Sequence, residues 1–335
     1  MSTLVEDWGT RLSDKIRRAL AVGDFASALR LAQHGDGQAR DLAREYAFMV
    51  HGLGFTLKAL LRLLAERARQ DGASTSLAAL LREFAGVLHA GASDVREDAV
   101  PAQLAQACVR ALESSQAGFA ADQARRADEI VQALSARNPA QAAALLEAKD
   151  RAYLAVHDPL VRFMADGFAW VFRHFGAQGL VDFHLATAQA QRAGFEKWER
   201  MPARDFAATT AFLLRQHMGE VSVEEGERRF TIRQSPCGSG GRLRLQGAYQ
   251  GPGALPFVES PGPLTFGEPR MPVYCTHCAI WNGSATLRWF GRAQWVFEQP
   301  AREDGGCTLH IYERREDAPA DYTRRVALGG PEDMA

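Results

Sequence analysis

The sequence predicts an α+β protein, in which an N-terminal all-α helical bundle precedes helices packed on a small antiparallel β-sheet with a cysteine-rich metal site. Residues 1 to about 218 are rich in Ala, Leu, Arg and Gln and repeat apolar residues at helical spacing. After Glu220, short runs alternate apolar and polar residues, and ten of the 14 prolines lie beyond residue 235. We expect an α-helical domain at 1–150, an α+β metal-binding domain at 151–325 and a flexible tail at 326–335.

Length and composition are those of a globular protein. The 335 residues are 47% hydrophobic, and 39 basic side chains nearly balance 40 acidic ones. This balance argues against a nucleic-acid or acidic-membrane partner. The first seven residues contain acids in place of the basic stretch and apolar run of a signal peptide, so we expect a cytoplasmic protein with no membrane partner. The oligomeric state stays open.

Helices are predicted in order along the first 218 residues. An apolar stripe predicts a long helix that ends at Asp71-Gly72. Asp158 and Pro159 predict the start of another helix, as N-cap and first helical residue, and Gly176 predicts its end. Two further helices are expected at 177–199 and 203–218. The stripe consists of Met49, Leu53, Leu57, Leu60 and Leu64.

Strands are predicted beyond residue 220. Residues 221–233 are typical of two strands around a Glu-Gly turn. Apolar and polar side chains alternate again at 242–249, 286–298 and 307–313, as in half-buried antiparallel strands. The proline-rich stretch at 250–273 is expected to form a long ordered loop or a sheet edge.

Four of the five cysteines are close together in the sequence. Cys275 and Cys278 form a Cys-x-x-Cys motif with His277 inside it, and Cys237 lies 38 residues upstream in a glycine-rich turn. Thiolates and imidazole suit the borderline softness of Zn²⁺, and a Cys-x-x-Cys turn lets two sulfurs reach one ion. The sequence therefore predicts a zinc site formed by Cys237, Cys275, Cys278 and His277.

The fourth ligand and the metal are open to alternatives. Cys307, His217 or His310 could replace His277 as a ligand. Iron is the less suitable metal, because an iron–sulfur cluster normally needs four cysteines and a mononuclear redox iron more often uses two histidines and a carboxylate. Four protein ligands would make the metal structural, whereas three ligands and a water would make it catalytic.

The cysteines also have explanations without a metal. A cytosolic Cys-x-x-Cys can be a redox dithiol, although the βαβ surroundings typical of that motif are absent from the sequence pattern. The cysteines could also be packed without any ligand. A nucleophilic Cys237 or Cys278 with His277 as its base would make a thiol hydrolase, but nothing obvious in the sequence orients the histidine.

Candidate substrate-binding and acid–base residues flank the cysteines. The glycine run at 238–241 is either a backbone nest for an anion or a hairpin turn beside a metal ligand. His217 and Glu220, just before the first strand, are the acid–base pair, and His277 is a third candidate. Trp281 is an aromatic candidate for substrate binding. The arginines that could bind a substrate's anionic group are Arg233, Arg242 and Arg288.

The order of motifs from about 203 to 315 resembles known small-molecule domains. A helix enters a hairpin, a cysteine follows at a glycine-rich turn in Pro236-Cys237-Gly238, and a second cluster follows in Tyr274-Cys275-Thr276-His277-Cys278. This layout resembles the vinyl-reductase-type domains, with their zinc-linked cysteines, and the aminothiazoline-carboxylate-hydrolase-like proteins. The resemblance covers about a third of the chain and implies ligand sensing or ring hydrolysis.

These observations support three hypotheses about function. The first is a zinc-dependent enzyme, of hydrolase type, that acts on a small anionic molecule through a metal-bound water. The second is a non-catalytic small-molecule-binding or sensor module with a structural zinc. The third is a helical adaptor with a zinc-stabilised cap. Metal content and a ligand screen would separate them.

Overall fold

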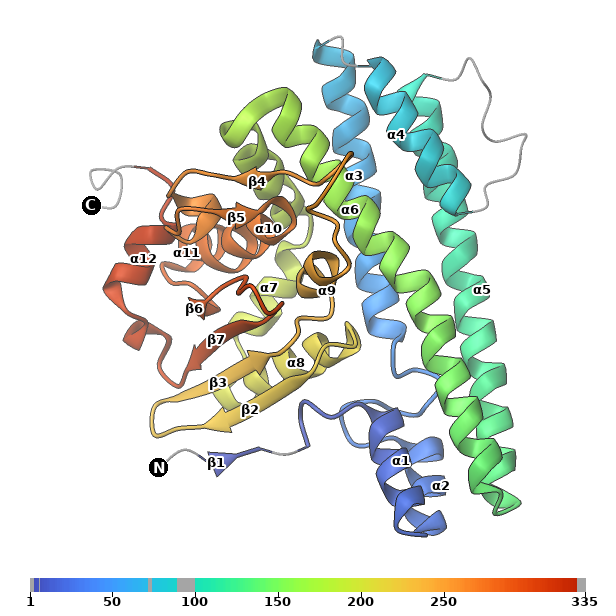
Figure 1. The fold of residues 1–335 in the computed structure, drawn as a ribbon. Helices are drawn as coiled ribbons and strands as arrows, with labels where there is room; N and C mark the ends of the chain where they lie inside the picture. Colours follow the sequence, from blue (N-terminus) through green and yellow to red (C-terminus); the bar gives the residue numbers. More distant parts are fainter. Residues whose placement is uncertain (1–2, 6, 72–73, 89–99, 330–335) are drawn as a thin grey trace. The chain divides into compact units, whose positions relative to one another are not determined.

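The computed structural model describes residues 3–5, 7–71, 74–88 and 100–329 (Figure 1). The chain forms two compact units. The helical unit is Thr10–Phe163 with Arg215–Met218, and the sheet-containing unit is Met1–Gly9, Met164–Leu214 and Gly219–Ala335. Helices and a small antiparallel sheet are both present, which confirms the α+β class. Of the expected tail, residues 330–335 lie outside the described residues.

The helical unit is built from α1 to α5 and the first part of α6. Helix α3 packs against α4 and α5, and α1 and α2 pack against each other. Leu57, Leu60 and Leu64 are fully buried, which confirms the apolar stripe, although Gly72 at its predicted end lies outside the described residues. The helices are α1 (Leu12–Ala21), α2 (Phe25–His34), α3 (Ala47–Asp71), α4 (Ser74–Val87), α5 (Pro101–Ser135) and α6 (Pro139–Ala190).

Helix α6 runs through the predicted start at Pro159, so that prediction is wrong. The helix continues because buried side chains on both sides of the proline, including Tyr153 and Phe163, keep it packed despite the missing N–H. Asp158 accepts a hydrogen bond from His157 at 2.7 Å. Gly176 does interrupt the helical backbone, with φ of 67°.

Helix α3 has the length and hydropathy of a membrane span over Ala47–Arg67, with a mean hydropathy of 1.4. Half of the window is buried inside the protein, and a core helix of a soluble protein has the same pattern. The cytoplasmic location therefore stays a prediction.

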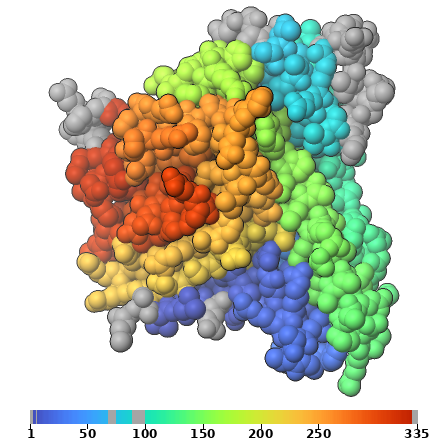
Figure 2. Space-filling model, viewed as in Figure 1, coloured from blue at the N-terminus to red at the C-terminus, as the bar shows by residue number. Residues whose placement is uncertain are grey.

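The sheet-containing unit has a five-stranded antiparallel sheet in the order β1-β2-β3-β7-β6. The β2–β3 hairpin confirms the prediction for 221–233, and β7 confirms the one for 307–313. In Figure 2 the C-terminal part of this unit, coloured orange to red, packs beside the yellow segment that contains β2 and β3. The strands are β1 (Thr3–Leu4), β2 (Val221–Glu225), β3 (Arg229–Gln234), β6 (Val296–Gln299) and β7 (Cys307–Tyr312).

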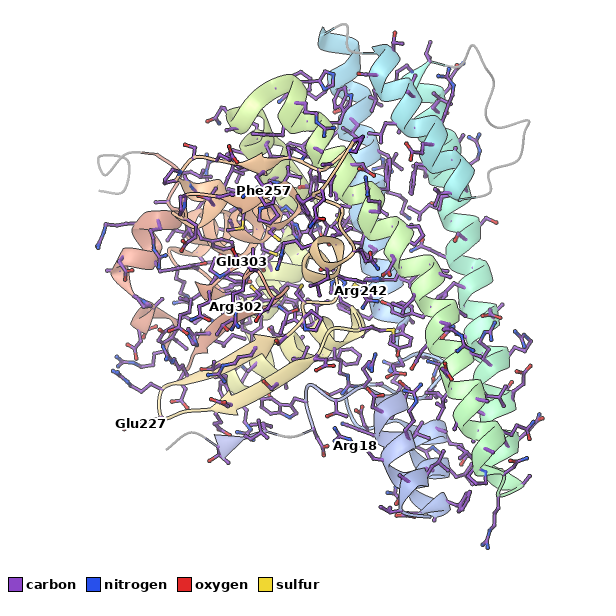
Figure 3. The ribbon with its side chains drawn as sticks, viewed as in Figure 1. Arg18, Glu227, Arg242, Phe257, Arg302 and Glu303 are labelled. Atoms are coloured by element: carbon purple, nitrogen blue, oxygen red, sulfur yellow. The ribbon has the colours of Figure 1, made fainter. Side chains whose placement is uncertain are left out.

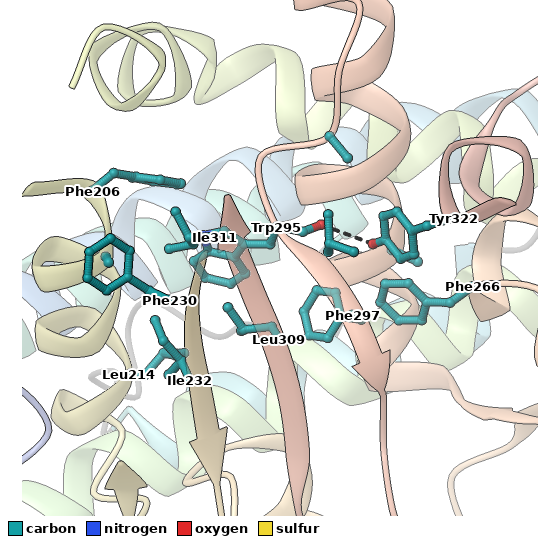
Figure 4. Close-up of a cluster of buried hydrophobic side chains, with 14 of the residues drawn as sticks. Phe206, Leu214, Phe230, Ile232, Phe266, Trp295, Phe297, Leu309, Ile311 and Tyr322 are labelled. Carbon is teal, nitrogen blue, oxygen red and sulfur yellow. Dashed lines mark hydrogen bonds between the residues drawn. The ribbon is translucent and has the colours of Figure 1, made fainter. Parts of the chain in front are cut away.

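One hydrophobic core joins this sheet to its helices (Figure 4). Leu214 of α8 lies beside Ile232 of β3, and Phe206 of α8 lies near Ile311 of β7. At the other end of the core, the Tyr322 hydroxyl donates to the Trp295 carbonyl oxygen at 3.0 Å. Helices α7 (Arg192–Glu199), α8 (Ala203–Gln216) and α12 (Ala320–Val326) belong to this region. The helix predicted at 203–218 is thus confirmed, whereas the one at 177–199 is divided between α6 and α7.

Two predicted strands are largely helical. Residues 242–249 contain the end of α9 (Gly240–Leu245) and a turn, and residues 286–298 contain most of α11 (Ala285–Phe290) before β6 begins. Apolar and polar residues that alternate over five or six positions fit a strand and a helix of one or two turns equally well. The prediction of a strand was therefore wrong at 242–249 and over most of 286–298. The proline-rich stretch contains the two-residue strand β4 (Phe257–Val258), and β5 (Met271–Pro272), which pairs with it.

Candidate metal centre

The antiparallel sheet brings Cys237 and Cys307 together. The register between β3 and β7 pairs Gln234 with Cys307, and Cys237 follows Gln234 by three residues. The Cys237 N–H donates to the carbonyl oxygen of Gly305 at 2.9 Å. Two cysteines separated by 69 intervening residues in the sequence therefore lie beside one another at one end of the strand pair.

Cys275 and Cys278 come from one helical turn. Cys275 ends a 3₁₀ turn at Val273–Cys275, and Cys278 lies in α10 (Thr276–Ala279). A spacing of three residues places both side chains on the same face of the turn. The Cys-x-x-Cys motif thus presents two thiols in one direction.

Two glycines allow the segment after Cys237 to approach the other cysteines. A Cβ at Gly240 would lie 2.9 Å from Sγ of Cys275, and one at Gly241 would lie 2.1 Å from the carbonyl oxygen of Gly305. Real Cβ atoms do not approach other atoms this closely, so side chains are excluded here. Close packing around the cysteines therefore requires glycine at 240 and 241.

All four cysteines are half-buried, and neighbouring cysteines raise the pKa values of Cys275, Cys278 and Cys307. Burial, with a smaller effect from Cys237, raises the pKa of Cys275 to about 11. Burial is also the main cause that raises the pKa of Cys278, and Cys275, Cys307 and Cys237 raise it further. The pKa of Cys307 is raised by burial and by Cys237 and Cys275. The four thiols form one cluster, and none is in a disulfide.

The described residues contain no group of three or more His, Cys, Asp or Glu side chains arranged to hold a metal ion as they stand. The structure shows the cluster of thiols but not the predicted zinc site. Binding one ion would need the sulfurs to move closer together, because a zinc–sulfur bond is about 2.3 Å long.

His277 is oriented by a backbone group. Its Nδ1 lies 2.5 Å from the carbonyl oxygen of Tyr274, which can only accept, so Nδ1 carries the proton. Its Nε2 therefore presents a lone pair, 3.4 Å from Sγ of Cys278. Burial lowers the pKa of His277 to about 4, against a smaller opposite effect of the Tyr274 hydrogen bond. The imidazole is neutral at physiological pH.

Trp281 belongs to a buried aromatic group on the other side of His277. Its Nε1–H donates to the carbonyl oxygen of His184 at 3.2 Å and contacts Oγ1 of Thr187 at 3.1 Å. The Trp281 and His277 rings lie 4.6 Å apart, centroid to centroid. Trp281 is 9% exposed, so its hydrogen bonds and packing account for it without a substrate.

The three predicted substrate-binding arginines occupy different places. Arg242 of α9, labelled in Figure 3, donates from Nε to the carbonyl oxygen of Gly238 at 3.1 Å. Arg233 of β3 pairs with Glu224 of β2 at 2.6 Å. Arg288 is an exposed residue of α11. The three side chains thus belong to three different elements, α9, β3 and α11.

The predicted acid–base pair is divided between the two units. His217 belongs to the helical unit, where its Nδ1 lies 2.8 Å from Nε2 of His157. Glu220 belongs to the sheet-containing unit and is exposed. His310, the other alternative ligand, lies on β7 with its Nδ1 3.1 Å from Oγ1 of Thr231 and its Nε2 3.2 Å from a carboxylate oxygen of Glu298.

Two residues beside the cysteines were missed in the sequence. The Arg244 guanidinium contacts Sγ of Cys275 at 3.3 Å, and Oγ of Ser239 lies 3.6 Å from Sγ of Cys237. The spacing of Ser239, two residues after Cys237, is a possible signal for a hydroxyl near that thiol. Arg244 has no comparable signal, since it lies 31 residues from Cys275.

No protein-family model, curated protein or solved structure matches this chain. The resemblance to the vinyl-reductase-type and aminothiazoline-carboxylate-hydrolase-like proteins therefore stays a prediction from the layout of the motifs.

Proposed function

We propose that the sheet-containing unit binds one zinc ion through Cys237, Cys275, Cys278 and Cys307, and that the ion stabilises this unit. The observation that carries the proposal is the gathering of four free thiols from three separate chain segments into one cluster. Cysteine packed only as a small apolar residue gives no reason for four of the five to meet.

Thiol chemistry supports a metal in this cluster. Zinc binds the deprotonated form, and the attraction of a dication for thiolates offsets the burial that raises the pKa values of Cys275, Cys278 and Cys307. All four cysteines are half-buried residues. Metal uptake is therefore expected to release protons from the cysteines.

Four thiolates favour a structural metal over a catalytic one. A tetrahedral zinc with four sulfur ligands has no open position for a water or a substrate. In this arrangement Cys307 takes the place predicted for His277, which already contacts Cys278 and Tyr274. The non-catalytic module with a structural zinc is thus the better-supported function, and the hydrolase acting on a small anionic molecule stays a prediction.

Metal analysis of cysteine variants tests this proposal. Protein purified under reducing conditions should contain about one equivalent of zinc, measured by elemental mass spectrometry after exhaustive dialysis. Serine at any of the four positions should lower the zinc content. Cys108→Ser is the matched control, because Cys108 is buried in α5 and its thiol donates to the Leu81 carbonyl oxygen at 3.4 Å.

Three results would overturn the proposal. Unchanged zinc content in the serine variants would remove the cysteines as ligands. A brown protein that contains iron would replace zinc. A reversible disulfide among these cysteines, with no bound metal, would identify a redox dithiol.

A further inference from the structure

We propose that Arg244 is a positioning residue of the centre formed by the four thiols. Arg244 holds the chain segments of this centre together, and its positive charge offsets part of the negative charge that the thiolates carry when a metal is bound. This inference rests on the proposed zinc site and adds a residue that is not itself a ligand.

Arg244 lies in α9, the helix that follows Cys237, and its guanidinium contacts the two other chain segments that carry cysteines. Its Nη1 contacts Sγ of Cys275 at 3.3 Å and the carbonyl oxygen of Gly240 at 3.1 Å. Its Nη2 donates to the carbonyl oxygen of Arg302 at 3.2 Å and approaches that of Gly306 at 3.5 Å. One planar side chain therefore contacts α9, the Cys-x-x-Cys turn and the loop before β7.

The carbonyl groups that Arg244 contacts lie within five residues of a cysteine in the sequence. Gly240 follows Cys237 by three residues, and Gly306 directly precedes Cys307. Figure 3 labels Arg302 on the same loop before β7. Because the guanidinium has five donors in a fixed plane, it can hold several acceptors at defined positions. The contacts of Arg244 hold these segments next to one another in the absence of an ion.

Charge gives Arg244 a second role. A zinc dication with four thiolates carries an excess of negative charge, which is unfavourable away from water. The guanidinium remains positive at any accessible pH, and an N–H···S bond lowers the electron density on the sulfur. Hydrogen bonds from outside the ligand set in this way tune metal affinity and the electronic properties of the metal–sulfur bond.

Two substitutions separate these roles. Arg244→Gln removes the charge and most of the donors, whereas Arg244→Lys keeps the charge but loses the planar geometry. We expect Arg244→Gln to bind the metal about 10- to 100-fold more weakly, the usual effect of losing a partner that supports the ligands. Arg244→Lys should lie between this variant and the wild type. Arg314→Gln is the control, because Arg314 is an exposed arginine of the same unit that donates to Asp317 at 2.7 Å.

The experiment uses the full-length protein with Co²⁺ as a spectroscopic probe and a chromophoric chelator as competitor. In the wild type, tetrahedral thiolate coordination should give sulfur-to-cobalt charge-transfer bands at one equivalent. In Arg244→Gln, those bands should shift in energy, and a higher Co²⁺ concentration should be needed to reach saturation. A purely structural role would weaken binding without changing the band energy of the saturated site.

The outcomes distinguish this inference from the proposed zinc site. If the wild type binds cobalt and both Arg244 variants match it in affinity and band energy, the role of Arg244 is wrong and the zinc site stands. If the wild type binds no metal, the zinc site is wrong, and this inference with it. If Arg244→Gln does not fold, the test uses Arg244→Lys alone. A Co²⁺ affinity and spectrum like those of the wild type in that variant would show that the guanidinium geometry is not needed.

Discussion

The Sγ atom of Cys278 lies 3.4 Å from Nε2 of His277, its neighbour in the chain. The sequence left open whether such a pair is a nucleophile and its base. The structure supplies the missing orienting group in the Tyr274 carbonyl oxygen, but burial lowers the pKa of His277 to about 4 and raises that of Cys278 well above its usual range. At neutral pH the pair is a thiol beside a neutral imidazole, so an activated thiolate is not expected.

Alkylation of the metal-free protein tests this conclusion. At pH 7.5 we expect Cys275 and Cys278 to react with iodoacetamide at least tenfold more slowly than a small thiol, since a raised pKa leaves less thiolate. Peptide mass spectrometry would give the rate at each cysteine. Alkylation of Cys278 faster than the small thiol would restore the nucleophile hypothesis.

The close approach of Gly241 to Gly305 predicts that alanine at position 241 lowers both zinc binding and stability. Gly241→Ala would place a Cβ 2.1 Å from the Gly305 backbone oxygen, where neither segment can move without separating Cys237 from Cys307. We expect lower zinc content and a lower melting temperature, measured by tryptophan fluorescence. All six tryptophans belong to the sheet-containing unit, so this signal reports on it alone.

Gly194→Ala is the matched control for Gly241→Ala. Gly194 lies in α7, and a Cβ there has nothing within 4 Å. Alanine should leave the zinc content unchanged and stabilise the helix by about 0.5–1 kcal/mol. Equal zinc loss in both variants would contradict the packing argument.

His184 predicts loss of stability in acid. Its Nε2 donates to Oγ1 of Thr276 at 2.8 Å, because that hydroxyl gives its own proton to the Val273 carbonyl oxygen, and its buried Nδ1 has no described partner. Burial, then the proximity of His277, lowers the pKa of His184 well below 6.5. As the pH falls through about 6.5, His184 becomes protonated in the unfolded chain but stays neutral in the folded protein. The contribution of His184 to the free energy of unfolding is therefore fully present above about pH 6.5. It decreases as the pH is lowered further, by up to about 1.4 kcal/mol per pH unit.

Urea unfolding of the metal-free protein, followed by tryptophan fluorescence between pH 7 and 5, measures this dependence. His184→Gln retains a donor for Thr276 but does not titrate, so its stability should fall less steeply with decreasing pH. His51→Gln, at an exposed position of α3, is the control. Identical slopes for the wild type and His184→Gln would show that His184 is not the titrating group.

The helical unit contains a buried ion pair whose loss should be costly. Nζ of Lys149 lies 3.3 Å from Oε2 of Glu45, and both side chains are almost completely buried. Lys149→Met would leave the Glu45 carboxylate without its cation, and breaking such a pair costs about 3–5 kcal/mol of unfolding free energy. Burial already raises the pKa of Glu45, against the attraction of Lys149.

Far-UV circular dichroism during urea unfolding would measure this loss. Adding Glu45→Gln to Lys149→Met should recover part of the stability, because the amide oxygen can still accept the Ser13 N–H that Glu45 accepts now at 3.2 Å. Arg151→Gln breaks an exposed pair with Glu147 and should cost less than about 1 kcal/mol. A Lys149→Met variant as stable as Arg151→Gln would contradict the prediction.

The sequence by itself determined the features that depend on neighbours within a few residues. The apolar stripe of α3, helix α8, the β2–β3 hairpin and the Cys-x-x-Cys motif were predictable, because helical and strand periodicity and turn chemistry are local. Local reasoning failed at α9 and α11, where short alternating runs fit either structure, and at Pro159, where packing on both sides keeps the helix continuous.

Tertiary structure alone decided which chemical groups meet. The sequence named Cys237, Cys275 and Cys278 but preferred His277 to Cys307, because distance along the chain was the only guide. The pairing of Gln234 with Cys307 in the sheet placed the fourth cysteine beside the first, and the same folding brought Arg244 to Cys275. Strand register across the sheet is set by the burial of one whole face in a shared core, a property of many distant residues together that no single motif contains.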